Sequence, residues 1–362
     1  MKIGFCCFIF LFTSNFFCQS YSQDYNSDTR ALALGESLVA SQSGIPSAEN
    51  NPATIASYNK TTLLYSKRDF RISKGSNNYL YSAGTILSTP VGTFELLYKH
   101  YRNYDLVFRT EENQEAGRIE IYDHTFNLSY ATDISDDLSA GVTLKTCRVV
   151  ASESKYLESN IPFLIDLGVI IKTDGFVQND SNNEKLFLGL AVQNFGGKLR
   201  EKYTFDSPYA STVEYSINIP RYLKLGFSYE FDINQNSSKI AKTIITCEYK
   251  NKLLNNTSNY GNYPIEFLGL GTEFIFYDIF TLRLGGILNS HDNPFGKKGE
   301  IFFRAGCGLN LPFDLIFNNS PFSLAFDYSN VPVYGGLYFY SKDITDNLWA
   351  FNLNLTYNSS LF

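Results

Sequence analysis

The chain has little of what metal-dependent enzymes and nucleic-acid-binding proteins rely on. Its 362 residues include one methionine, one tryptophan and three histidines, and its net charge is −6 at pH 7. Neutralising nucleic-acid phosphates takes clustered Lys and Arg, so an acidic chain does not favour that partner. His100, His124 and His291 are scattered, without the spacing of a metal site. We therefore expect no nucleic-acid partner, no metal, no cofactor and no catalytic residue, and predict that the chain is not an enzyme.

Long apolar runs and a cysteine framework are also missing. Beyond the first residues no stretch of about eighteen apolar residues occurs, so a transmembrane helix is not expected. Outside residues 1–22 the only cysteines are Cys147, Cys247 and Cys307, which are widely spaced and odd in number. Neither a disulfide framework nor a zinc site fits that pattern. We interpret these three as small apolar residues within strands.

The first residues are typical of an export signal. Lys2 is followed by an apolar run over residues 3–12 that is too short to span a membrane as a helix. Ser20 and Ser22 supply the small residues that a cleavage site needs, so residues 1–22 are predicted to be a signal peptide. A lipoprotein signal ending before Cys18 is the alternative, but bulky residues precede that cysteine.

Aromatic residues, by contrast, are plentiful, with 26 Tyr and 31 Phe, and they alternate with polar residues. In Leu348–Asn358, one face carries Trp349, Phe351, Leu353, Leu355 and Tyr357. Successive side chains of a strand point to opposite faces, so this segment has one apolar and one polar face. We predict that it is the closing strand, pairs with the first strand near Thr61, and places Trp349 and Tyr357 near the two membrane interfaces.

The same alternation recurs in about fourteen segments. They lie near Thr61–Arg68, Asn78–Ser88, Gly92–Phe108, Ile119–Thr132, Leu138–Ala151, Pro162–Thr173, Leu186–Phe195, Arg221–Phe231, Ile240–Lys250, Ile265–Phe276, Phe280–Leu288, Glu300–Leu311, Phe322–Ser329 and Leu348–Asn358. Alternation alone fits both a sandwich and a membrane barrel, but an open sheet of so many strands needs protected edges and a closed barrel has none. The fold class predicted is therefore all-β, a closed antiparallel transmembrane β-barrel over residues 59–362.

Several segments resemble the PorV/PorQ group of the FadL-like outer-membrane barrels. The opening Asp28–Gly35 and Glu49–Ala53 is similar to the group's "ARA-x-ALG … NPA" start. The further similar segments are Pro220–Phe231, Leu268–Glu273, Leu282–Gly286, Ala305–Leu309 and Phe326–Tyr328. The resemblance covers nearly the whole chain after the signal. It implies a location in the cell outer membrane and an N-terminal segment, residues 23–58, that plugs the lumen.

For function, the resemblance implies a non-enzymatic component of type IX protein secretion, acting as a cargo shuttle or in cargo attachment at the cell surface. Its partners would be outer-membrane lipid and a secretion-machinery or cargo protein. More distant FadL relatives take up hydrophobic small molecules, which is the alternative and would require a hydrophobic ligand and an apolar cavity near the plug. A hydrolase site at one rim is a third hypothesis, which rests only on other barrels that carry one.

Two groups of residues are candidates for the functional site. The plug or gate candidates are Arg30, Gly35, Asn51, Pro52 and Ala53. The lumen-facing polar candidates are Lys224, Glu230, Glu273, Arg283, Arg304 and Asp327, which share a face with glycines and small polar residues. Both signs of charge are present, so they form either a polar network that packs the lumen or a gated solute path. Pro52 fixes its own backbone and restrains Asn51, so this motif is either a rigid anchor or a ligand gate.

Overall fold

The computed structural model describes residues 25–70, 78–109, 115–174, 184–204, 212–235, 238–253, 266–289, 299, 301–317, 320–331 and 348–358. The predicted signal peptide, residues 1–22, and the aromatic C-terminal Phe362 lie outside these described residues. Among the described residues, no helix is long and apolar enough to cross a membrane.

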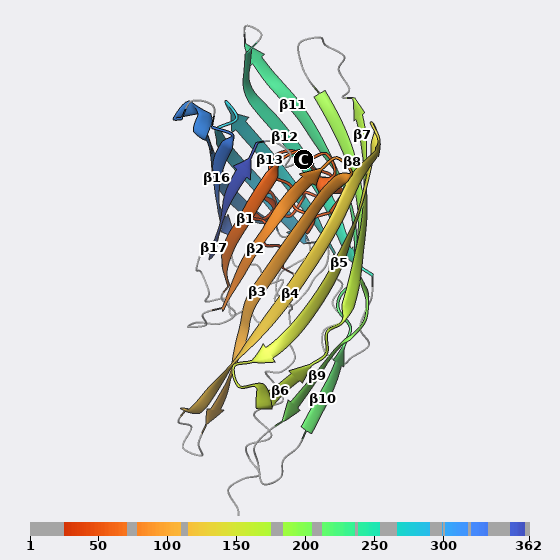
Figure 1. The fold of residues 1–362 in the computed structure, drawn as a ribbon, viewed down its shortest axis with the longest axis vertical. Helices are drawn as coiled ribbons and strands as arrows, with labels where there is room; N and C mark the ends of the chain where they lie inside the picture. The colour runs from red at the N-terminus through yellow and green to blue at the C-terminus, as the bar shows by residue number, and fades with distance from the viewer. Residues whose placement is uncertain are drawn as a thin grey trace, which may run out of the picture.

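Fourteen antiparallel strands close into one barrel, which confirms the predicted fold class (Figure 1). They are β1 (Thr61–Phe70), β2 (Asn78–Thr89), β3 (Gly92–Arg109), β4 (Glu115–Ser135), β5 (Leu138–Ala151), β7 (Phe163–Asp174), β8 (Glu184–Gly196), β11 (Tyr222–Gln235), β12 (Ser238–Lys252), β13 (Glu266–Phe276), β14 (Phe280–Asn289), β15 (Ile301–Pro312), β16 (Phe322–Val331) and β17 (Leu348–Tyr357). The last strand pairs with the first, Thr61 opposite Tyr357 and Arg68 opposite Ala350, so the predicted closure is confirmed.

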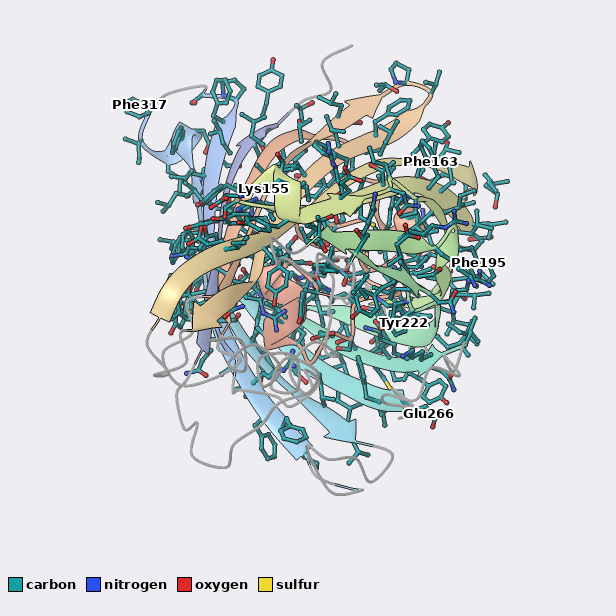
Figure 2. The ribbon with its side chains drawn as sticks, turned by 90° about the horizontal axis from the view of Figure 1, so that it is seen from below. Lys155, Phe163, Phe195, Tyr222, Glu266 and Phe317 are labelled. Carbon is teal, nitrogen blue, oxygen red and sulfur yellow. The ribbon has the colours of Figure 1, made fainter. Side chains whose placement is uncertain are left out.

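The outer face of the barrel is apolar. Leu63 is 56% exposed, Leu284 61% and Phe303 75%, although each is a large hydrophobic side chain on a strand. Figure 2 shows Phe163 and Phe195 at the outer edge of the barrel as well. A closed barrel satisfies its backbone hydrogen bonds internally, and an apolar exterior is what the hydrocarbon core of a bilayer requires. The chain is therefore an outer-membrane β-barrel.

The two ends of the barrel differ. Short turns join β2 to β3, β4 to β5 and β13 to β14 at the upper end in Figure 1. The long β3–β4 hairpin and a separate three-stranded sheet lie at the lower end. Short turns face the periplasm and longer connections face outward in such barrels. We therefore call the upper end periplasmic and the lower end external.

The small external sheet adds strands that the sequence did not predict. The stretch between β8 and β11 contains β9 (Leu199–Thr204) and β10 (Thr212–Ile217), which pair with each other, and β9 also pairs with β6 (Leu157–Ser159). Leu199 and Tyr203 of β9 are buried against inward-facing apolar residues of β4 and β5. Burial of this apolar face explains why a segment rich in charged residues is a strand.

The N-terminal segment, residues 25–58, lies against the inward faces of the barrel strands. It contains α1 (Thr29–Ala33) and η3 (Pro52–Ile55), while two further short turns of 3-10 helix, η4 (Ser154–Tyr156) and η5 (Phe313–Leu315), lie in connections between strands. The helix α1 ends at Ala33. Gly35 and Glu36 have φ of 67° and 58°, and this left-handed backbone stops the helix.

Candidate functional site

A band of inward-facing glycines brings the barrel wall into contact with the N-terminal segment. Its members are Gly141 on β5, Gly168 on β7, Gly189 on β8, Gly269 on β13 and Gly285 on β14. A Cβ atom at any of these positions would lie within 3.0 Å of the segment, mostly of its backbone. The missing side chain at one inward position on each of five strands is therefore what lets the segment lie directly on the wall.

The Asn51–Pro52–Ala53 motif holds the segment to this band. Asn51 Nδ2 donates to the carbonyl oxygens of Val39 at 2.7 Å and Val169 at 3.2 Å, and Asn51 Oδ1 accepts from Ala53 N at 3.0 Å. Pro52 begins η3, where its missing N–H leaves no donor unpaired. These contacts join two parts of the segment to β7, which supports the interpretation of the motif as a rigid anchor.

Arg30 begins a chain of four charges, three of them buried, that links the segment to three strands. Its Nη2 lies 2.7 Å from Glu273 Oε2 on β13. Arg283 on β14 lies 2.6 Å from Glu273 Oε1 and 2.5 Å from Asp327 Oδ1 on β16. The Arg30 guanidinium also donates to the Ser43 carbonyl oxygen at 2.7 Å, which helps to fix its position. Four of the predicted site residues are thus brought together, with alternating charge.

The other three lumen-facing candidates pair elsewhere on the wall. Arg304 Nη1 lies 3.1 Å from Glu36 Oε1, and Lys224 Nζ lies 3.7 Å from Glu248 Oε1. Glu230 Oε2 lies 2.5 Å from Lys242 Nζ. All three candidates are buried, and their partners are supplied partly by neighbouring strands and partly by the N-terminal segment. This arrangement supports a polar network that packs the lumen.

The sequence did not identify the carboxylates of the N-terminal segment as partners. Glu49 Oε1 lies 2.6 Å from Lys99 Nζ on β3, and Glu36 pairs with Arg304. Burial acts to raise the pKa of Glu36, but the charges of Arg304, Lys250 and Arg68 outweigh it and lower the pKa to about 2. The sequence did offer one signal for these partners. Basic residues on the inward faces of the strands need carboxylates when they are buried, and another part of the chain can supply them.

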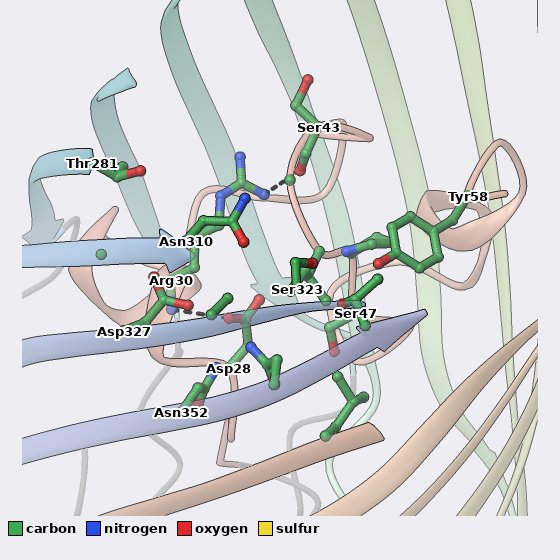
Figure 3. A pocket seen from close by; sticks show the side chains of 18 of the residues that line it. Asp28, Arg30, Ser43, Ser47, Tyr58, Thr281, Asn310, Ser323, Asp327 and Asn352 are labelled. Carbon is green, nitrogen blue, oxygen red and sulfur yellow. Dashed lines mark hydrogen bonds between the residues drawn. The ribbon is translucent and has the colours of Figure 1, made fainter. Parts of the chain in front are cut away.

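A cavity of about 480 Å³ lies beside this network (Figure 3). It opens between the N-terminal segment and the periplasmic halves of β1 and β12 to β17. Figure 3 shows Asp28, Arg30, Asp327 and Asn352 lining it together. The uptake hypothesis expects an apolar cavity next to the plug. The wall of this cavity combines charged and amide groups of the network with apolar side chains such as Leu64 and Ile275, so the expectation stays a prediction. Among the described residues, no group of three or more potential ligands is placed to hold a metal ion.

Two apolar clusters also lie on the inward faces of β2 to β7. Leu80 and Tyr101 pack with Tyr25 of the N-terminal segment. Ile119, Ile121 and Leu164 form a second cluster, which the small external sheet covers. Charged residues reach the same external half of the barrel, since Lys224 and Arg304 lie near the external ends of β11 and β15. The clusters were not predicted from the alternation, which indicates only which residues face inward.

Comparison with known proteins extends these observations. No protein-family model matches the sequence, and no curated protein matches it. Among solved structures, the CymD monoaromatic hydrocarbon channel is similar, with 11% identity over 93% of this chain and 98% of that chain and a TM-score of 0.52. A FadL homologue from Pseudomonas aeruginosa is similar at 14% identity over 94% and 99% of the two chains, with a TM-score of 0.50.

The toluene transporter TodX of P. putida is similar as well, at 10% identity over 91% of this chain and 97% of that chain, with a TM-score of 0.50. The fold is that of the FadL-type outer-membrane barrels. Identities this low show the fold alone, and the closer assignment to the PorV/PorQ group stays a prediction. The similar FadL-type structures are described as a channel, a transporter and a FadL homologue, which agrees with the prediction of a barrel that is not an enzyme.

Proposed function

We propose that this barrel carries hydrophobic small molecules across the outer membrane. The observation that carries the proposal is the match of fold over nearly the full length of both chains to a monoaromatic hydrocarbon channel. The sequence favoured a role in protein secretion and held uptake of hydrophobic molecules as the alternative. The similar structures support the alternative better, because two of them are described as handling toluene or monoaromatic hydrocarbons.

The cavity beside the N-terminal segment gives the proposal a physical basis. A hydrophobic solute that leaves water gains about 25 cal/mol for each Å² of apolar surface it buries. Leu64 and Ile275 are apolar residues in the wall of this cavity. The clusters around Tyr101 and Ile121 offer no such surface, because the residues in them are fully covered.

Uptake by whole cells tests the proposal. Cells that lack the chain would be compared with cells that produce it, using ring-labelled toluene as the probe. Leu64→Asn places an amide in the wall of the cavity and should slow uptake. Leu63→Asn is the matched control, because Leu63 lies on the same strand, points outward and is 56% exposed. Equal uptake with and without the chain would contradict the proposal.

A role in protein secretion is the second candidate. The observation that favours it is the N-terminal segment, which the glycine band and the buried ion pairs hold on the wall. A barrel with a fixed segment inside suits a scaffold that binds a cargo or secretion protein through its external connections. Purification in mild detergent tests this role. A stable complex with such a protein would support it, and recovery of the barrel alone would count against it.

A further inference from the structure

Five outward-facing residues form a continuous row across β1 to β5, the strands on the near side of Figure 1. We call it the basic-aromatic row, and it consists of Lys67, Tyr81, His100, His124 and Arg148. Each residue lies directly opposite the next in the strand register, so the side chains are neighbours on one face. The row joins residues that are far apart in the sequence, so the spacing of the histidines along the chain does not reveal it.

The centre of the row is a pair of histidines. His100 Nδ1 and His124 Nδ1 are 3.5 Å apart, and their ring centroids are 4.9 Å apart. Tyr98 OH lies 2.6 Å from His124 Nδ1, and the Tyr122 ring stacks on His100 at 5.2 Å. Both imidazoles are thus held in place by aromatic neighbours, with polar edges on the outer surface of the barrel.

The ends of the row carry fixed positive charge. Lys67 Nζ lies 5.0 Å from the Trp349 ring centroid and 3.5 Å from Asp69, so it is partly neutralised. Arg148 is exposed and makes no ion pair with any of the described residues. A surface arginine that faces outward from a membrane barrel without a carboxylate is costly unless an anion reaches it.

The depth of the row matches the level of lipid headgroups. His100 and Arg148 lie about eight to ten residues from the periplasmic ends of β3 and β5, and a transmembrane strand crosses the bilayer in about 9–11 residues. Aromatic side chains gather at this level, as they do at membrane interfaces. On the periplasmic side of the row the outer face is apolar, with Phe126 and Leu144 about half exposed.

We propose that the basic-aromatic row binds the phosphate groups of a phosphorylated glycolipid in the outer leaflet. Arg148 would hold a phosphate through two parallel N–H donors, and the imidazoles would donate to it from the side. The acyl chains would then lie on the apolar wall on the periplasmic side of the row. The positive charge selects an anion, and continuity with the lipid-facing surface selects a phosphorylated lipid over a soluble anion. This site is independent of the route through the lumen.

Native mass spectrometry of the full chain in mild detergent tests the proposal. The probes are diphosphorylated lipid A and the same lipid after removal of both phosphates. We expect the intact lipid to be retained and the dephosphorylated lipid to be lost. His124→Gln combined with Arg148→Gln should lower retention of lipid A at least tenfold. Arg221→Gln is the matched control, because Arg221 is another rim arginine, placed over the ring of Phe195 on the outer face of β8.

Three outcomes would overturn the proposal. Equal retention of the dephosphorylated lipid would show that apolar contact alone is responsible. Displacement of lipid A by inorganic phosphate at equal concentration would show a soluble-anion site. Because both comparisons use the unmodified chain, they decide the matter even where the double variant fails to fold. For a folded double variant, undiminished retention would equally refute the proposal.

Discussion

Gly189→Ala tests whether the glycine band holds the N-terminal segment on the wall. The added Cβ would overlap the carbonyl group of Val39 and approach Ala40 Cα at 2.8 Å. Gly189 is paired on both sides, with Ile170 of β7 and Gly226 of β11, so the wall cannot retreat. The segment must move instead, which strains the hydrogen bond of 2.9 Å from Val39 N to Glu248 Oε2.

Overpacking of this kind costs about 1–3 kcal/mol. A local loss of stability of that size corresponds to about 5- to 150-fold faster hydrogen exchange through opening of the segment. Hydrogen exchange followed by mass spectrometry measures this directly in peptides that cover residues 38–42. Gly197→Ala is the control, because the nearest atom to its added Cβ is 3.4 Å away. The reasoning is refuted if Gly189→Ala leaves exchange in this peptide unchanged, or if the control accelerates it equally.

Three further predictions concern the network, the wall and pH. Glu273→Gln leaves Arg30 and Arg283 buried without their shared carboxylate and should cost about 3–5 kcal/mol, seen as a lower temperature for loss of the folded gel band. Leu270→Arg, at an outward position, should cost about 2–4 kcal/mol in urea unfolding from vesicles. Burial raises the pKa of Asp28 to about 6, so the stability contributed by its protonated form is lost as pH rises from about 4 through 6. Exchange in α1, corrected for intrinsic rates, should be faster at pH 7.5 than at pH 5, and Asp28→Asn should remove the difference.

The wall of the barrel was predictable because each strand carries its own signal. A period of two marks an inward and an outward face in every strand, and polar turns mark its ends. The closing pair of β1 and β17 followed from the closure of the barrel, which joins the last strand to the first. The strands β9 and β10 were missed, because their few apolar residues make sense only against the cluster around Ile121.

The site was predictable only in part. The alternation of polar and apolar residues placed Glu273, Arg283 and Asp327 on inward faces. The identity of their partners, however, depends on the path of the N-terminal segment. That path is set by contacts of backbone on glycine, which leave no periodic pattern in the sequence. The pairing of His100 with His124 was likewise hidden, since residues 24 positions apart meet only through the register of β3 and β4.

The most direct test of the proposed function is the dependence of the initial toluene uptake rate on external concentration, measured in cells with and without this chain. A channel with a binding cavity of limited capacity should add a saturable component that disappears with the chain and is reduced in Leu64→Asn. Rates that rise in simple proportion to concentration and coincide in both kinds of cell would contradict the account.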